Sequence, residues 1–182
     1  VVVNLCIDFL ENRTDKKTVD LCSGSGAIAV ALDKISGAEV TAVEIDETAF
    51  SYLETNLKEN NSSVKPVMAD ALEICETFAD GELDLIVSNP PYIKSADIET
   101  LQKEVRLEPR LALDGGEDGC DFYREIVSRW SRKLKKGGAL AFELGENQAD
   151  AVKALMTDKG FSDFKISLDF GGVQRAIIGT LL

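Results

Sequence analysis

Strand-length apolar segments alternate with helix-length periodic segments along almost the whole chain, and this alternation constrains the fold more than any other feature of the sequence. Several strand segments are apolar on both faces, which is typical of a sheet that helices cover on both sides. The regular succession of strand, helix and strand predicts a doubly wound α/β domain with a mostly parallel sheet. The seven expected strands span residues 17–21, 39–43, 64–69, 83–89, 138–144, 164–170 and 174–182.

Helices are expected where apolar residues recur at helical spacing, including the segments that follow the first and second strands. An opening helix spans residues 2–11, and a later one carries the cations of residues 129–136 near its C-terminal end and stops at Gly137. A further helix spans about residues 147–159. Only Gly-Gly-Val separates the last two strands, so these strands should form a C-terminal antiparallel hairpin.

Composition limits the class of protein. The chain has 182 residues, of which 45% are hydrophobic, so residues 1–182 are expected to form one domain with its own core. No stretch approaches the ~18 consecutive apolar residues of a membrane-spanning helix, and no basic leader precedes an apolar stretch. We therefore expect a cytoplasmic protein with no membrane partner, in which four widely separated cysteines stay reduced.

Charge and the lack of histidine narrow the chemistry. The formal net charge of −12 opposes binding to a phosphate backbone, so no direct nucleic-acid partner is expected. The sequence contains no histidine, which removes Ser-His and Cys-His nucleophile pairs and any imidazole base. Its cysteines lack the spacing of a zinc site, so no metal is expected. Catalysis would have to use carboxylates, amides, tyrosine or positioning alone.

A glycine-rich turn follows the first strand, in the stretch VDLCSGSGAIAV. Gly24 and Gly26 let the backbone turn sharply and come close to a ligand at the N-terminus of the next helix. A Gly-x-Gly pair also occurs in purely structural turns, so the surrounding residues must decide between the two interpretations.

Polar side chains stand at the ends of four expected strands: Asp20, Glu44, Asp70 and Asn89. Ligands of open parallel sheets bind at the carboxyl ends of the strands, so these side chains should converge on one crevice. A carboxylate after the second strand is suited to holding two ribose hydroxyls. A dinucleotide motif would have glycine where Ala29 stands, and Asp20 would repel a phosphate. We therefore predict S-adenosylmethionine, whose sulfonium and ammonium groups suit this polarity, with S-adenosylhomocysteine as the product.

The fourth strand ends in Ser-Asn-Pro-Pro-Tyr. Prolines cannot continue a strand ladder and restrict the preceding residue, so the chain must leave the sheet rigidly at Asn89. The Asn89 side-chain oxygen and the Pro90 carbonyl can each accept one N–H of a planar NH₂ group, while Pro91 locks the turn and Tyr92 supplies an aromatic wall. Methyl transfer to such a nitrogen depends on positioning and needs no histidine base.

Six consecutive motifs resemble those of a known family: DLCSGSGAIAVAL, VTAVEID, NPPYI, EVRLEPRLALDGGEDGCDFYREIV, FELGENQ and DFGGVQRAIIG. They are similar to the motifs of the HemK-type protein-(glutamine-N5) methyltransferases, which modify the glutamine of peptide-chain release factors. The similarity covers nearly the whole chain and is most specific in residues 104–124. It implies a class I S-adenosylmethionine-dependent methyltransferase (Rossmann-like) fold and release factors as protein substrates.

The resemblance also implies roles for individual residues. Asn89, Pro90 and Tyr92 would be catalytic and, with Pro91, would bind the substrate amide. Residues 22–26 would wrap the cofactor, Glu44 would hold its ribose, and Asp70 and Ala71 would lie near the adenine. The full cofactor-binding set comprises Asp20, Cys22, Ser23, Gly24, Ser25, Gly26, Glu44, Asp70, Ala71 and Asn89.

The sequence departs from the family pattern in two respects. Family members usually carry an N-terminal helical domain that helps to grip the release factor, joined by a segment containing Pro-Arg-Pro-Glu-Thr-Glu, and neither occurs here. We therefore expect this chain to be the catalytic domain of a longer protein. Glu44 stands where aspartate is frequent, and this longer carboxylate would shift the ribose slightly.

Other interpretations remain open on the residues alone. Adenine-N6 methyltransferases of nucleic acids share Asn-Pro-Pro-Tyr, ribosomal-protein glutamine methyltransferases share its chemistry, and a non-enzymatic binding module could use the same fold. The long connection of residues 93–119 is a second open point. Ion pairs among Glu104, Arg106, Glu108 and Arg110 would order it, or it would contact the substrate directly.

Overall fold

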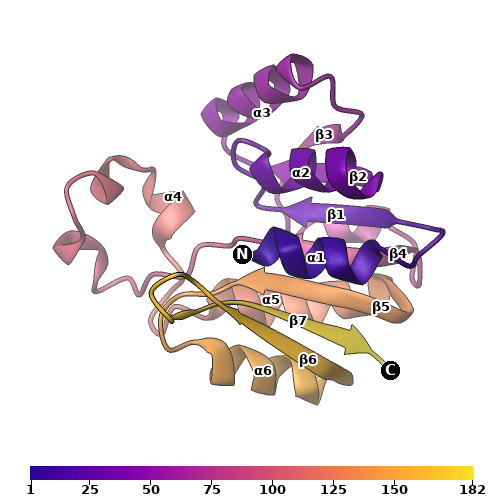
Figure 1. Ribbon diagram of the computed structural model, residues 1–182. Coiled ribbons are helices and arrows are strands. Elements are labelled where there is room, and N and C mark those ends of the chain that lie inside the picture. The colour runs from indigo at the N-terminus through magenta and orange to yellow at the C-terminus, as the bar shows by residue number, and fades with distance from the viewer.

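The computed structural model describes residues 1–182 and contains one seven-stranded sheet. The strands are β1 (Lys17–Leu21), β2 (Glu39–Glu44), β3 (Lys65–Met68), β4 (Leu83–Ser88), β5 (Leu134–Glu143), β6 (Phe161–Leu168) and β7 (Gln174–Leu181). Their order across the sheet is β3-β2-β1-β4-β5-β7-β6 (Figure 1). Neighbours among β1 to β5 pair in parallel, whereas β7 is antiparallel to β5 and β6. The predicted doubly wound sheet with a C-terminal antiparallel hairpin is confirmed.

Helices cover both faces of the sheet. They are α1 (Val2–Leu10), α2 (Ala27–Ser36), α3 (Glu47–Glu59), α4 (Arg110–Leu113), α5 (Asp121–Trp130) and α6 (Ala149–Asp158). Short 3₁₀ turns are η1 (Ile74–Thr77), η2 (Ile98–Thr100), η3 (Val105–Leu107) and η4 (Ser131–Lys133). No helix has both the length and the apolar character needed to span a bilayer.

Two hydrophobic cores lie on opposite sides of the sheet. One contains buried side chains of α1, α2 and α3, and the other contains those of α5 and α6. Strand β5 shows why its sequence is continuously apolar: Ala139 and Ala141 face the first core, while Leu140 and Phe142 face the second. Successive strand residues point to opposite faces, so a strand covered on both sides needs apolar residues throughout.

The helix that was expected to stop at Gly137 ends earlier, at Trp130. The turn η4 follows, and β5 begins at Leu134, which pairs with Leu83 of β4. Trp130 and Leu134 are both buried in the same core, so their spacing of four residues imitates a helical repeat across a helix-to-strand boundary. Gly137 lies inside β5 with a φ of +75°.

The same boundary corrects the expectation for the neighbouring cations. Only Arg129 lies in the last turn of α5. Arg132 instead pairs with Glu76, and the buried Lys133 ammonium lies 2.8 Å from a carboxylate oxygen of Asp80. These residues therefore join the start of β5 to the loop before β4.

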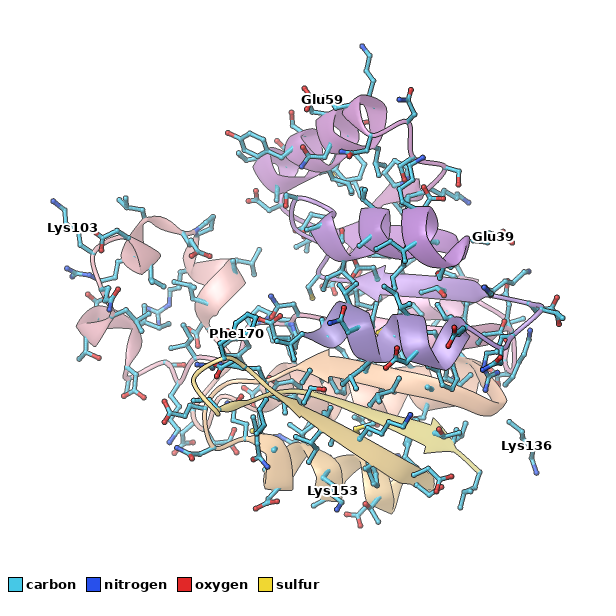
Figure 2. The ribbon with its side chains drawn as sticks, viewed as in Figure 1. Glu39, Glu59, Lys103, Lys136, Lys153 and Phe170 are labelled. Atoms are coloured by element: carbon cyan, nitrogen blue, oxygen red, sulfur yellow. The ribbon has the colours of Figure 1, made fainter.

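The carboxyl ends of β1 to β5 share one edge of the sheet with the turn between β6 and β7, because β7 is antiparallel to β5. The segment that contains η2, η3 and α4 projects away from the sheet, with Lys103 on its outer side (Figures 1 and 2). Phe170, on the turn between β6 and β7, is fully exposed at this edge (Figure 2). Any ligand site at the strand ends is therefore bordered by exposed loops.

Candidate functional site

A cavity of about 460 Å³ lies at the carboxyl edge of the sheet. Its volume falls within the ~300–1,000 Å³ typical of small-molecule sites. Segments that follow β1, β2, β3 and β4 contribute to its wall, together with the long loop and α5. The predicted site residues in its lining are Cys22, Ser23, Gly24, Ser25, Glu44, Asp70, Ala71, Asn89 and Pro91.

Four predicted residues lie outside this lining: Asp20, Gly26, Pro90 and Tyr92. Gly26 still shapes the wall, because it precedes α2 with a φ of +82° and the Leu53 side chain occupies the space that a Cβ would need. Gly24 also has a left-handed φ, of +53°. The turn therefore needs glycine at Gly24 for its backbone angle and at Gly26 for both its angle and its packing.

Glu44 fastens this glycine turn to the end of β2. One carboxylate oxygen accepts the Gly24 N–H at 2.7 Å, and the other accepts the N–H groups of Ile45 at 2.9 Å and Asp46 at 2.8 Å. Asp46 in turn accepts the Ala49 N–H at 2.8 Å and caps α3. A carboxylate has about four acceptor sites, so Glu44 retains capacity for a ligand hydroxyl in the cavity.

Asp20 is fully buried at the end of β1. Its Oδ2 accepts the Ala29 N–H at 3.1 Å, while its Oδ1 has no hydrogen-bond partner. Burial, with a further contribution from the negative charge of Glu44, raises the pKa of Asp20 to about 8. The Ser23 hydroxyl, in the cavity wall, is buried and also lacks a partner.

The segment after β3 forms another wall. Asp70 accepts the Leu72 N–H at 2.7 Å, and the Ala71 carbonyl accepts the indole N–H of Trp130 at 2.8 Å. Trp130 is buried, and its ring packs against Phe78 at a centroid distance of 5.2 Å. The buried indole thus fixes the backbone of a residue that lines the cavity.

The Asn-Pro-Pro-Tyr turn leaves β4 beside this cavity. The Ser88 hydroxyl donates to the Leu21 carbonyl at 2.8 Å and holds the strand end. Asn89 is exposed and its side-chain amide makes no hydrogen bond within the chain, although the residue lines the cavity. Tyr92 is half-buried, and burial raises the pKa of its phenol. The Asn89 amide is therefore available to a ligand.

In the long loop, sequence reasoning named Glu108 only as a charge that would order the loop, yet Glu108, Pro109, Leu111 and Ala112 all contribute to the wall. The ion pairs expected to order this loop are absent among the four named charges. Arg110 instead pairs with Asp114 at 2.9 Å. The length of the loop was the only available signal, since exposed residues such as these carry no periodicity.

Comparisons with known proteins identify the family of this chain. The family described as "Methyltransferase small domain" matches residues 3–110. A release factor glutamine methyltransferase of Geobacter sulfurreducens is 42% identical over 165 residues, covering 90% of this chain and 57% of that protein. Another, of Bordetella pertussis, is 34% identical over 182 residues, covering 100% of this chain and 67% of that protein. This chain belongs to the release factor glutamine methyltransferase family.

The family expected from the six motifs is thus confirmed. The chain spans less than two thirds of the first relatives it matches, including 57% of the Geobacter sulfurreducens protein and 64% of the Clostridium acetobutylicum protein. A methyltransferase structure from Pyrococcus furiosus has a TM-score of 0.71 and 23% identity, covering 98% of this chain and 82% of that one. A precorrin-6y C5,15-methyltransferase from Geobacter metallireducens has a TM-score of 0.70 and 14% identity, covering 99% and 87%. These structures share the methyltransferase fold.

Proposed function

We propose that this chain is a catalytic domain, over residues 1–182, that transfers a methyl group from S-adenosylmethionine to the side-chain amide nitrogen, N5, of a glutamine in peptide-chain release factors. One observation carries the proposal: the free amide of Asn89 borders the same cavity as the glycine turn and Glu44. A site for a nucleoside-containing cofactor and a site for a planar amide therefore adjoin one another. The family membership supports release factors as the source of that amide.

The residues of the cavity fit the cofactor. Glu44 retains acceptor capacity for one ribose hydroxyl, and Ser23 offers a buried hydroxyl without a partner. Gly24 has no atom within 4 Å of the position a Cβ would take, so the backbone can approach a ligand closely there. Asp70 and Ala71 would border the base. Bound S-adenosylmethionine would supply an activated methyl group on a sulfonium.

The turn residues would position the substrate. A glutamine amide nitrogen is a weak nucleophile because its lone pair is delocalised into the carbonyl. The Asn89 Oδ1 atom and the Pro90 carbonyl would each accept one of its N–H groups and favour positive charge on the nitrogen. Tyr92 would provide an aromatic wall, and the proton would be lost to water after transfer. Holding the reactants in line can contribute ~7–11 kcal/mol to catalysis.

The acidic surface fits a protein substrate better than a nucleic acid, since a net charge of −12 repels phosphates. We therefore propose no direct nucleic-acid partner. Because release factors act in translation, we also propose a cytoplasmic location for this protein.

Radiolabelled methyl transfer to a panel of purified release factors, ribosomal proteins and DNA tests the proposal. Asn89→Ala should lower turnover on the release factor by about 100-fold or more, because one of the two fixed acceptors is lost. Its affinity for S-adenosylmethionine, measured by calorimetry, should stay within about three-fold of wild type. Asn12→Ala, at an exposed position without a side-chain hydrogen bond, is the matched control. Near-normal turnover by Asn89→Ala, or transfer to DNA alone, would refute the assignment.

A further inference from the structure

Gln148 is a buried amide that the proposed chemistry does not use. It lies directly before α6, four residues beyond Leu144, and only 8% of its surface is exposed. Glutamine is rarely buried so completely unless its polar atoms are paired. Its side chain points toward the Asn-Pro-Pro-Tyr turn, as its hydrogen bonds show.

Every polar atom of this amide has a partner. Its Nε2 atom donates to the Tyr92 carbonyl at 2.9 Å and to the Gly119 carbonyl at 3.1 Å. Its Oε1 atom accepts the Gly145 N–H at 2.9 Å. The Tyr123 hydroxyl lies 3.2 Å from Oε1 and 2.9 Å from the Glu143 carbonyl and can donate to either. A flipped amide would face two carbonyls with its oxygen, so the partners fix its orientation.

Two glycines bring the chain close enough for these contacts. A Cβ on Gly119 would lie 2.5 Å from the Tyr92 carbonyl oxygen and 2.7 Å from the Gln148 Nε2 atom. A Cβ on Gly115 would lie 2.7 Å from the Tyr92 Cα and 2.9 Å from the Pro91 carbonyl oxygen. The segment after α4 therefore packs directly against the backbone of the turn, where no side chain would fit.

The turn is consequently held at both ends. At its start, Ser88 belongs to β4 and bonds to Leu21. At its end, the Tyr92 carbonyl bonds to Gln148, and the Ile93 N–H donates to the Leu113 carbonyl at 2.9 Å. Between these anchors the two prolines leave few free torsions.

We propose that Gln148 is a positioning residue for methyl transfer, which holds the Tyr92 carbonyl and thereby fixes where the Asn89 and Pro90 acceptors point. The inference rests on the function proposed above. Gln148 does not border the cofactor cavity, so it would act through the turn. Its loss should lower turnover without weakening cofactor binding.

Gln148→Met is the first test, because methionine has a similar length but cannot donate to the two carbonyls. The catalytic constant with a release factor should fall about 10- to 100-fold, as a misplacement near 1 Å would produce. Affinity for S-adenosylmethionine should change by less than about three-fold. Hydrogen exchange of the Ile93 amide, which is bonded at the end of the turn, should become faster.

Gln148→Glu supplies a second test with a pH readout. An ionised glutamate would face the Tyr92 and Gly119 carbonyls with an oxygen, whereas the protonated form restores one donor. Burial raises the pKa of such a carboxyl, so turnover relative to wild type should increase as pH falls from about 8 to about 6. The titratable neighbours are Tyr92, Cys120, Tyr123 and Glu143, whose pKa values burial raises. A negative charge on Glu143 would disfavour ionisation of the new carboxyl, so it raises the pKa of that carboxyl in the same direction as burial does.

Gln174→Met and Gln174→Glu, at an exposed position on β7, are the matched controls and should retain wild-type turnover. Thermal unfolding identifies any variant that fails to fold. If Gln148→Met does not fold, the pH dependence of the ratio of Gln148→Glu turnover to wild-type turnover tests the proposal instead.

Three results would overturn the inference: full turnover by folded Gln148→Met, a loss of cofactor affinity that matches the loss of turnover, or a pH-independent ratio for Gln148→Glu. If wild type methylates no release factor, the proposed function fails instead. In that case, hydrogen exchange of the Ile93 amide in Gln148→Met still tests whether Gln148 fixes the position of the turn.

Discussion

Asp20→Asn should stabilise the folded chain, and the gain should increase with pH. The carboxyl group of Asp20 is buried with one oxygen unpaired, and burial raises its pKa from 3.8 to about 8. Because the pKa is higher in the folded state, the chain takes up a proton on folding at pH values between 3.8 and about 8. The contribution of the protonated group to stability is therefore complete below about pH 4 and is lost as pH rises toward 8.

The size of this effect follows from the two pKa values. At pH 7 the carboxyl is ionised in the unfolded chain and mostly neutral in the folded chain. This pH lies about three units above the unfolded pKa of 3.8. At ~1.4 kcal/mol per unit, the buried acid lowers stability by about 4 kcal/mol. Asparagine can still accept the Ala29 N–H, but its NH₂ group would lack a partner, at a cost of ~1–3 kcal/mol. The net gain is about 1–3 kcal/mol at pH 7 and near zero at pH 5.

Thermal unfolding followed by circular dichroism between about pH 5 and pH 8 measures this gain. For a chain of this size, ~1 kcal/mol corresponds to about 2–4 °C in Tm. Asp150→Asn, which removes an exposed carboxylate in the first turn of α6, is the control and should show no gain that grows with pH. A constant difference in Tm between Asp20→Asn and wild type across this range would show that Asp20 is ionised in the folded chain and would refute the reasoning.

One further prediction concerns the backbone contact at the end of the Asn-Pro-Pro-Tyr turn, and another concerns the cavity wall. Gly119→Ala should destabilise the chain by about 1–3 kcal/mol more than Gly172→Ala, because both residues have left-handed φ angles but only the Gly119 methyl would strike the Tyr92 carbonyl. Urea unfolding compares the two variants, and equal losses would exclude the steric cause. Burial raises the pKa of Cys22 to about 12, so alkylation of this thiol at pH 8 should be far slower in the folded chain than in the denatured one. Mass spectrometry of Cys22 peptides measures both rates, and similar rates would contradict the burial.

Periodicity predicted most of the sheet correctly because its strands are covered on both faces. β1 occupies the expected Lys17–Leu21, and the hairpin of β6 and β7 turns at the Gly-Gly-Val sequence. The boundary between α5 and β5 was wrong for a physical reason. Leu134 is apolar and buried in either assignment, and only its pairing with Leu83, far away in the sequence, decides that it belongs to a strand.

The site was predictable only where a residue type is tied to backbone geometry. Gly24 and Asn89 were found because a glycine turn and a strand that ends in prolines have few structural alternatives. The role of Gln148 was not visible, since its partners are backbone carbonyls of residues 92 and 119, and a carbonyl has no sequence signature. The contribution of Pro109 and Leu111 to the wall depends on how the long loop folds back, which local propensity does not specify.

The three backbone hydrogen bonds of Glu44 affect how a ligand would be recognised. A carboxylate that already accepts the N–H groups of Gly24, Ile45 and Asp46 has its rotamer fixed before anything binds. The side-chain entropy of ~1–2 kcal/mol that a free glutamate would lose on binding has thus been lost during folding. The site is preorganised, so a hydroxyl-bearing ligand meets a rigid acceptor and its affinity is not reduced by the cost of ordering that side chain.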